Sequence, residues 1–476
     1  MQTEQRASAA AARRPTPPPP LHLVFVPFLA RSHFAPLAAK AAAANRGEDL
    51  TTASILTTPH FASLAAPSVP VHVAPLRSPV AHDDFSLLPT TDPSAAQAFF
   101  AAAEAALAPA LASLLRAHNN NAGHVAVVSD AVLYWAPRVA RDHGVPHVTF
   151  HTVGAFAASA MVAVHLHRRR LQLQPPEADG FPSVVKLRPA QVNEEALAHL
   201  PLFRAAEAES CAVAFNSFAA LEADYAAYYE TQLAGSAQKV FLVGPTRQLA
   251  VSPPPPPPPR GVTGRDPILQ WLDARPARSV VYACFGSTCA MAAAQLRELA
   301  AGLRASGHPF LWVIPSPEEE EERASSHGMV VAGRWAPQAE VLAHRAVGGF
   351  LTHCGWNSVL EALCFGVPLA TWPLRAEQFL NEAFLVEAAR VGVRVREVVT
   401  EAERDAAVVP GEAVARAVGR LMGGGEEDVA RRARARELGD AARAAVAEGG
   451  SSREEWARLV DELRAFYGRT TSGAHR

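Results

Sequence analysis

The stretch Val347-Gly-Gly-Phe-Leu-Thr-His-Cys-Gly-Trp-Asn-Ser-Val-Leu-Glu-Ala-Leu-Cys364 predicts a strand, a tight turn and a helix in direct succession. Residues 347–352 form an apolar run of strand length, and residues 357–364 carry apolar side chains at helical spacing. Free backbone N–H groups and the helix dipole favour an anion at the start of such a helix. The turn therefore predicts a phosphate site in an α/β fold, at His353, Gly355, Asn357 and Ser358.

The residues around this unit suit the other parts of a nucleotide sugar. Trp335 offers a flat stacking face, Gln338 offers an amide, and Glu361 can accept hydrogen bonds from vicinal hydroxyls. A simpler interpretation is that Ser358 and Glu361 form only a capping box. That interpretation leaves the tryptophan and the amide unexplained, as well as the Glu377-Gln378 pair after the strand predicted at 368–372.

The block from Trp335 to Gln378 resembles the C-terminal signature of the plant UDP-dependent glycosyltransferases, and the resemblance extends over nearly the whole chain. It implies an α/β fold of two facing Rossmann-like domains (GT-B type) with an interdomain cleft. It also implies inverting transfer from a UDP-sugar, with uracil on Trp335 and the ribose at Gln338 and Glu361. The donor-binding residues that the resemblance implies are Thr152, Ser287, Trp335, Ala336, Gln338, His353, Gly355, Trp356, Asn357, Ser358, Glu361, Glu377 and Gln378.

Two polar residues in the first half are predicted at the carboxyl ends of strands, where open α/β sheets bind ligands. His33 follows the strand 21–26 in a loop, before a helix that Pro36 is predicted to open (37–45). Asp130 follows the strand 124–129 and precedes a helix predicted at 132–143. A lone loop histidine is usually structural, and a strand-end aspartate usually caps the next helix.

Together, however, a histidine and a carboxylate are what general-base catalysis on a hydroxyl requires. The resemblance agrees, because His33 matches the family's catalytic histidine and Asp130 matches its partner. Ser32 stands where the family usually has glycine. Its side chain is expected to narrow the acceptor entrance or to reorient the loop.

The length of 476 residues predicts two or three domains. We expect an N-terminal acceptor-binding domain (21–248), a proline-rich linker (249–265) and a C-terminal UDP-sugar-binding domain (266–450). The resemblance implies that a last helix (451–467) packs back on the first domain, and residues 1–20 and 468–476 are predicted to be disordered. Pro253 to Pro259 also match an SH3-type ligand, but their place between two α/β halves favours a linker.

The composition is that of a soluble globular protein, with 49% apolar and 19% charged residues. A formal net charge of −2 gives no general attraction to nucleic acid or anionic membranes. Five cysteines without a C-x-x-C pair indicate reduced thiols. The early apolar run 21–30 is too short to span a membrane, so we expect a cytoplasmic protein, not inserted in a membrane and monomeric.

The sequence has no dinucleotide fingerprint, no P-loop and no D-x-D pair that would chelate a metal against a diphosphate. We therefore expect a metal-independent reaction with UDP-glucose as co-substrate and no other cofactor. In the family, glutamine at Gln378 goes with glucose, whereas Glu377 stands where aspartate is common and leaves sugar preference open. A flavonoid or other phenol is the expected acceptor, ahead of terpenoids, hormones and carboxylic acids. The alternatives are another sugar-nucleotide enzyme, such as an epimerase, and a catalytically silent UDP-sugar-binding protein.

Overall fold

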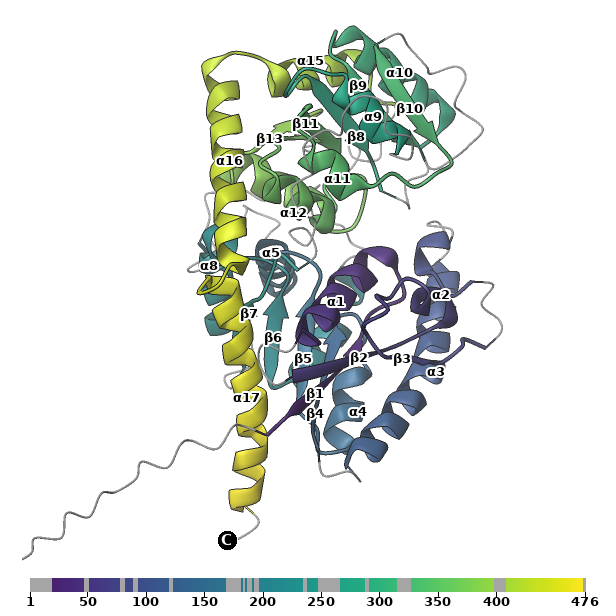
Figure 1. Cartoon of the computed structure of the whole chain (residues 1–476), viewed down its shortest axis with the longest axis vertical. Coiled ribbons are helices and arrows are strands. Elements are labelled where there is room, and N and C mark those ends of the chain that lie inside the picture. Colours follow the sequence, from purple (N-terminus) through teal and green to yellow (C-terminus); the bar gives the residue numbers. More distant parts are fainter. Residues whose placement is uncertain are drawn as a thin grey trace, which may run out of the picture.

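Two parallel β-sheets, one in each half of the chain, organise the structure (Figure 1). The structure is a computed structural model that describes residues 19–46, 51–77, 82–88, 93–119, 123–167, 181–182, 185, 191, 197–233, 238–246, 266–286, 291–314, 327–397 and 408–473. Ser287, the linker 249–265 and most of the leader 1–20 lie outside these residues.

The N-terminal sheet has the order β3-β2-β1-β4-β5-β6-β7. Its strands are β1 (Leu21–Val26), β2 (Thr51–Thr57), β3 (Val71–Val73), β4 (His124–Asp130), β5 (His147–His151), β6 (Ala212–Phe215) and β7 (Lys239–Leu242). From β1 the chain adds β2 and β3 toward one edge of the sheet, and from β4 it adds β5, β6 and β7 toward the other edge. This reversal is the doubly wound arrangement that the sequence predicts.

The C-terminal sheet has the order β10-β9-β8-β11-β12-β13. Its strands are β8 (Val280–Cys284), β9 (Phe310–Ile314), β10 (Gly328–Ala332), β11 (Val347–Thr352), β12 (Leu369–Thr371) and β13 (Gly392–Arg394). The reversal here lies between β8 and β11. All six residues of β11 are buried, as expected for a central parallel strand covered on both faces.

Helices cover both faces of each sheet (Figure 1). Those of the first half are α1 (Arg31–Ala44), α2 (Pro59–Ala62), α3 (Pro93–Asn119), α4 (Ala136–Asp142), α5 (Ala155–His167), α7 (Leu200–Glu207) and α8 (Ala219–Tyr228), with short turns η1 (Phe85–Leu87) and η3 (Tyr229–Leu233). Those of the second half are α9 (Pro267–Asp273), α10 (Ala293–Ala305), α11 (Gln338–Ala343), α12 (Trp356–Cys364), α13 (Gln378–Ala383), η6 (Phe384–Ala388), α15 (Gly411–Met422), α16 (Glu426–Val446) and α17 (Ser451–Gly473).

The prediction that His33 lies in a loop before a helix opened by Pro36 is wrong. Helix α1 begins at Arg31, so His33 lies in its first turn and Pro36 lies inside the helix. At this position the proline removes the backbone hydrogen bond that residue 36 would donate to the carbonyl of residue 32. His33 is therefore held by a helix, with its N–H donating to Ala30 O (2.9 Å).

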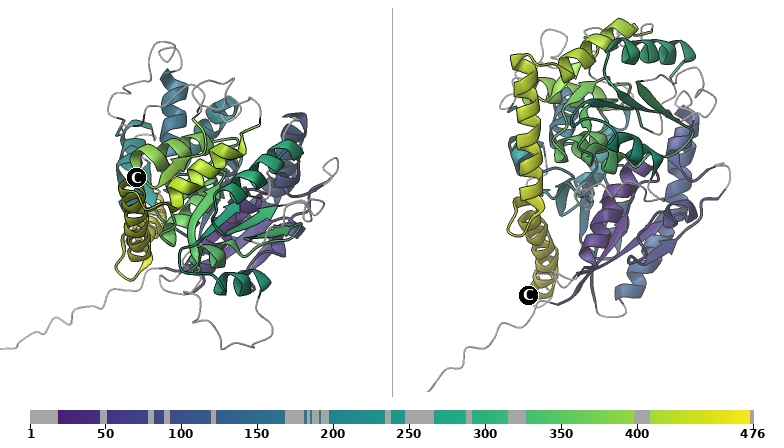
Figure 2. Two further views of the ribbon diagram at one scale, coloured as in Figure 1. Left: turned by 90° about the horizontal axis from the view of Figure 1, so that it is seen from above. Right: turned by 45° about the horizontal axis from the view of Figure 1, so that its top comes forward.

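The two last helices run along both domains (Figures 1 and 2). Helix α16 packs on α12, and α17 packs on β7 and β4 of the N-terminal sheet. The predicted end of the last helix at residue 467 is wrong, because α17 continues to Gly473. Tyr467 stabilises this end, because its hydroxyl donates to Val125 O (2.6 Å) and its ring stacks on His124.

Helix α3 is the one described helix that is long and apolar enough to cross a membrane, judged by length and composition over Ser94–His118. One face of it packs into the N-terminal core through Phe99, Leu107 and Leu111. Glu104, near its middle, accepts hydrogen bonds from Tyr134 (2.6 Å) and Arg138 (3.1 Å). These contacts make α3 a regular part of the N-terminal domain.

Candidate active site

The reversal points of the two sheets both lie at the domain interface, and candidate site residues follow the strands there. In the N-terminal sheet, His33 follows β1 and Asp130 ends β4, the two strands on either side of the reversal. In the C-terminal sheet, Gly286 follows β8 and His353 follows β11. Because ligands of open α/β sheets bind at such points, the topology alone indicates a site between the domains.

His33 and Asp130 form a close pair. His33 Nδ1 lies 2.8 Å from Asp130 Oδ2, and Asp130 Oδ1 accepts a hydrogen bond from Val132 N (3.1 Å). Asp130 is buried, whereas a quarter of the His33 side chain is exposed. A carboxylate accepts only, so Nδ1 carries the proton and Nε2 keeps a free lone pair. Asp130 thus holds the imidazole in one tautomer and also orders the turn before α4.

Thr152 completes the surroundings of the imidazole, with its Oγ1 3.0 Å from His33 Nδ1. Burial lowers the pKa of His33, but the charge and hydrogen bond of Asp130, together with the charge of Glu377, outweigh burial and raise the pKa above its ordinary value. Glu377 belongs to the C-terminal domain. The electrostatics of His33 therefore depend on both domains.

On the C-terminal side, His353 is packed between two glycines. A Cβ on Gly355 would lie 2.5 Å from His353 Nε2, and one on Gly286, whose φ is +79°, would lie 3.1 Å from the ring. Both positions therefore exclude larger residues. Burial, with the nearby Arg375, lowers the pKa of His353 to about 4, so the ring is neutral at neutral pH.

The capping-box interpretation of Ser358 and Glu361 is wrong. Gly355 is the N-cap residue of α12 and no side chain caps the helix. Both residues are instead tied to Gln338, whose Nε2 donates to Ser358 Oγ (3.1 Å) and Glu361 Oε2 (2.8 Å). The helix start therefore keeps its backbone N–H groups free of side-chain caps, as an anion site requires.

Glu377 and Gln378 lie at the start of α13, after the left-handed residue Ala376 (φ +52°). Gln378 Oε1 accepts from Leu374 N (3.0 Å) and Arg375 N (3.1 Å), which orders the loop before the helix. Burial raises the pKa of Glu377. The pair is thus fixed to its own loop and lies within electrostatic range of His33.

Trp335 is the most exposed large side chain of the site, with 63% of its surface accessible. Arg31 of the N-terminal domain lies over the indole, with its Cζ 5.6 Å from the ring centroid. Arg31 also pairs with the buried Asp84 (Nε to Oδ2, 3.6 Å). Next to Trp335, Ala336 is buried. Sequence reasoning missed Arg31, although its place two residues before His33 was a signal.

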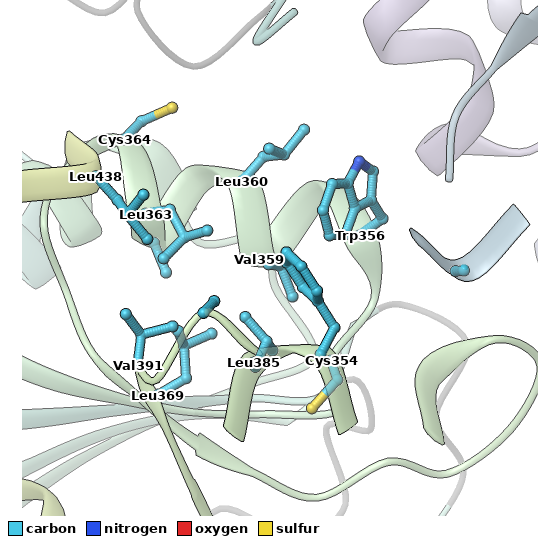
Figure 3. Packing of buried hydrophobic residues seen from close by; sticks show 14 of the residues in the cluster. Cys354, Trp356, Val359, Leu360, Leu363, Cys364, Leu369, Leu385, Val391 and Leu438 are labelled. Carbon is cyan, nitrogen blue, oxygen red and sulfur yellow. The ribbon is translucent and has the colours of Figure 1, made fainter. Parts of the chain in front are cut away.

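Sequence reasoning also missed the residue that Trp356 and Asn357 contact. Asn216 directly follows β6, accepts from Trp356 Nε1 through its backbone oxygen (2.9 Å) and donates through Nδ2 to Asn357 Oδ1 (3.4 Å). Figure 3 shows Trp356 at the N-terminal end of α12, apart from Leu369 and Val391, which pack below the helix. The sequence did contain a signal for Asn216, because it is a polar residue at the carboxyl end of a strand.

Of the predicted site residues, Asp130, Thr152 and Glu377 lie close to His33, and Ser358 and Glu361 are bound to Gln338, whereas Ser287 lies outside the described residues. Among the same residues, no group of three or more His, Cys, Asp or Glu side chains is arranged to hold a metal ion. The cysteines that the structure describes, Cys211, Cys284, Cys354 and Cys364, are free thiols.

Comparisons with known proteins agree with this geometry. Residues 33–248 match the family described as glycosyltransferase, N-terminal domain, and residues 266–408 match the family described as UDP-glucoronosyl and UDP-glucosyl transferase. UDP-glycosyltransferase 73D1 of Arabidopsis thaliana is 33% identical over 501 aligned residues, which cover 93% of this chain and 96% of the relative. The chain belongs to the plant UDP-glycosyltransferase family.

Two further relatives of this glycosyltransferase illustrate the likeness. The UDP-glucose flavonoid 3-O-glucosyltransferase 7 of Fragaria ananassa is 33% identical over 93% of this chain and 96% of its own length. The structure of Phytolacca americana UGT2 complexed with UDP-2fluoro-glucose and pterostilbene superposes with a TM-score of 0.75 at 27% identity, over 94% of this chain and 99% of that one. The GT-B fold and glycosyl transfer from a UDP-sugar to small molecules are therefore confirmed for this glycosyltransferase.

Proposed function

We propose that the enzyme transfers glucose from UDP-glucose, with inversion, to a hydroxyl of a small lipophilic metabolite, with His33 as general base and Asp130 as its partner. The observation that carries this proposal is the 2.8 Å contact between His33 Nδ1 and Asp130 Oδ2 at the reversal point of the N-terminal sheet. It leaves Nε2 as the proton acceptor, on a ring whose imidazolium form a carboxylate stabilises.

The reaction is a single displacement. His33 Nε2 takes the proton of the acceptor hydroxyl as its oxygen attacks the anomeric carbon. The bond from that carbon to the diphosphate breaks, UDP leaves with the electron pair, and the configuration inverts. Asp130 steadies the imidazolium, and because Asp130 is buried, its charge is little screened by water.

The donor lies against the C-terminal domain in this proposal. Uracil stacks on the exposed Trp335, the ribose hydroxyls bond to Glu361 near Gln338, and Glu377 and Gln378 hold the glucose. Thr152 contacts the sugar from the N-terminal side while it also contacts His33. The diphosphate is assigned to Ser287, His353, Asn357 and Ser358. Ala336, Gly355 and Trp356 are assigned to the donor site as a whole.

We propose a metal-independent departure of UDP. The start of α12 offers its backbone N–H groups and the positive end of its dipole, and neutral His353 can donate an N–H. The absence of a D-x-D pair from the sequence supports the same view. Added EDTA is expected to leave turnover unchanged, and loss of activity restored by a divalent ion would contradict this point.

The acceptor proposed is a flavonoid or other phenol, because aromatic side chains gather beside His33. Phe28 packs edge-on against His33 (5.4 Å between ring centroids) and stacks on Phe100 (5.2 Å), which in turn meets Phe85 (5.7 Å) and Phe203 (6.5 Å). Phe85, Phe100 and Phe203 are only half-buried. Such faces suit planar aromatic acceptors. The flavonoid in the name of one relative and the pterostilbene bound in the structure of another are compounds of this kind.

The test is a UDP-release assay with UDP-glucose over mixed panels of phenols, terpenoids and carboxylic acids, followed by NMR of the product. We expect UDP release that depends on a phenol, and a β-glucoside from the α-linked donor. An α-glucoside would overturn the single displacement. Donor binding without UDP release on any panel would favour a silent binding protein, and conversion of the sugar without UDP release would favour an epimerase.

The remaining expectations about the whole protein are also proposals. We propose the boundaries 21–248 and 266–450 for the two domains, a linker at 249–265, a monomeric state and a cytoplasmic location. The free thiols of the four described cysteines support a reducing compartment.

A further inference from the structure

The first turn of α12 is joined to the N-terminal domain by a chain of hydrogen bonds. Trp356 donates to Asn216, Asn216 Nδ2 donates to Asn357 Oδ1 (3.4 Å), and Asn357 Nδ2 donates to the backbone carbonyl oxygen of Ser32. Ser32 is the residue before His33 in α1. Asn357 therefore connects the helix turn that carries His33 with the domain that holds the donor.

Pro36 explains why the Ser32 carbonyl is available. In an α-helix the N–H of each residue donates to the carbonyl four positions earlier, so residue 36 would donate to Ser32. Proline has no N–H, and α1 nevertheless continues through it to Ala44. The side-chain amide of Asn357 supplies the donor that the helix itself cannot. The Ser32 carbonyl, which lacks the helical N–H donor of residue 36, therefore faces the other domain next to His33.

The surroundings leave this contact little freedom. Trp356 is 3% exposed and Asn216 is fully buried. A Cβ on Gly154 would lie 2.9 Å from the Trp356 ring and 2.8 Å from Glu222, so only glycine lets the indole approach. The end of α12 that bears Trp356 in Figure 3 is thus fixed against the N-terminal domain. Asn357 is the next residue, and from this position its half-buried side chain donates to the Ser32 carbonyl.

We propose that Asn357 is a positioning residue for the transfer step, which sets the place of His33 relative to the anomeric carbon. The inference rests on the proposed role of His33. It differs from the diphosphate contact expected for Asn357, because the bond runs to the opposite domain. The base belongs to one domain and the sugar to the other, and a misplacement of about 1 Å between reacting groups costs about 10²-fold in rate.

The first experiment compares Asn357→Ala and Pro36→Ala with the wild type at saturating UDP-glucose and phenol. For Asn357→Ala we expect kcat at saturating UDP-glucose to fall about 10- to 100-fold. Loss of the proposed diphosphate contact is expected to weaken UDP binding as well, and saturation separates that effect from kcat. Pro36→Ala restores an N–H that competes for the Ser32 carbonyl without touching the donor side. We expect it to lower kcat by a smaller factor and to leave the Kd of UDP unchanged.

Asn45→Ala is the matched control, because Asn45 ends the same helix and its Nδ2 donates to Ala53 O (3.0 Å) far from the interface. It should keep the wild-type kcat. The melting temperature of each variant reports folding. The proposal is overturned if Asn357→Ala and Pro36→Ala both keep the wild-type kcat, or if Asn357→Ala only weakens UDP binding.

A double-mutant cycle separates this inference from the proposed function. If Asn357 acts through His33, Asn357→Ala causes no further loss of kcat in the His33→Ala background. A further loss as large as in the wild type would overturn the positioning role and leave the base assignment intact. Wild-type turnover of His33→Ala itself would overturn the base assignment instead.

Discussion

At the scale of single residues, the proposed chemistry depends on how His33 is surrounded. Asp130 fixes one ring nitrogen, Thr152 lies on the same side, and Glu377 adds a negative charge from the other domain. The result is a pKa above the ordinary value in spite of burial. As the proposed base, His33 is stronger than a free histidine, but it is protonated, and hence inactive, at pH values where a free histidine would already be neutral.

The first prediction concerns this pH dependence. The wild-type kcat/KM should fall as the pH drops through the raised pKa of His33, above 6.5. Asp130→Asn removes the charge that raises it, so the acidic limb should move to lower pH and turnover should fall by roughly 10²- to 10⁴-fold. The measurement is a pH–rate profile from pH 5 to 9. Asp142→Asn, at an exposed aspartate, is the control, and coincident acidic limbs for Asp130→Asn and wild type would refute the account.

Position along a strand was enough to predict that His33 and Asp130 lie at one sheet edge, where their side chains are 2.8 Å apart, because the carboxyl ends of parallel strands share that edge. It was not enough to predict the contact between Thr152 and His33, which lie 119 residues apart. Nor could it predict that Gln338 binds the side chains of Ser358 and Glu361. Side-chain pairs of this kind depend on the exact packing of α11 against α12, which local sequence patterns do not encode.

At the scale of elements, the start of α5 is shaped by one buried carboxylate. Glu222 of α8 accepts hydrogen bonds from Ala155 N (3.1 Å) and Phe156 N (2.8 Å). Burial raises the pKa of Glu222 to about 7, although its hydrogen bonds lower it. This carboxylate caps a helix beside Trp356 and thus supports the interface between the domains.

The second prediction follows from the sign of that shift. Because the folded-state pKa is higher than that of the unfolded chain, the folded state binds the extra proton. The contribution of Glu222 to stability therefore falls as the pH rises from about 4.5 to about 7. Relative to the wild type, Glu222→Gln should gain stability on going from pH 5 to pH 8.

Urea unfolding at both pH values measures this effect. Glu222→Ala, which leaves two buried N–H groups without their acceptor, should lose about 1–3 kcal/mol at either pH. A difference between Glu222→Gln and the wild type that is the same at pH 5 and pH 8 would show that the carboxylate does not titrate in this range.

The elements themselves were predictable to different degrees. The continuous apolar runs 21–26 and 347–352 predicted the strands β1 and β11 with their observed bounds. The start of α1 was misjudged because a proline near the start of a helix is often its first residue. Here the proline lies in the second turn of the helix. The end of α17 was misjudged because the contact of Tyr467 with Val125 is tertiary.

At the scale of the whole molecule, α17 joins the C-terminal half to the N-terminal sheet. Trp456 is 7% exposed in the N-terminal core, stacks on Phe25 and carries Lys40 Nζ over its ring at 4.4 Å. The helix that leaves the second domain thus ends in the core of the first. This connection holds the two sheet edges, and the residues on them, in one relative position.

The third prediction tests this connection with two tryptophans. Trp456→Ala should destabilise the protein by about 3–5 kcal/mol, because it empties a buried site. Trp335→Ala, at a side chain that is 63% exposed, should leave the melting temperature nearly unchanged and weaken UDP binding. Calorimetry and UDP titration of both variants make the comparison. Equal melting temperatures for the two variants would contradict the role of α17.

The most direct measurement of the central claim, that the N-terminal domain supplies the base and the C-terminal domain binds UDP, is made on His33→Ala. Turnover with a phenol acceptor and the Kd of UDP are determined on the same preparation, with His143→Ala as the control at a histidine away from the interface. We predict a fall in kcat of roughly 10²- to 10⁴-fold with UDP affinity unchanged. Unchanged turnover with lost UDP affinity would contradict the account.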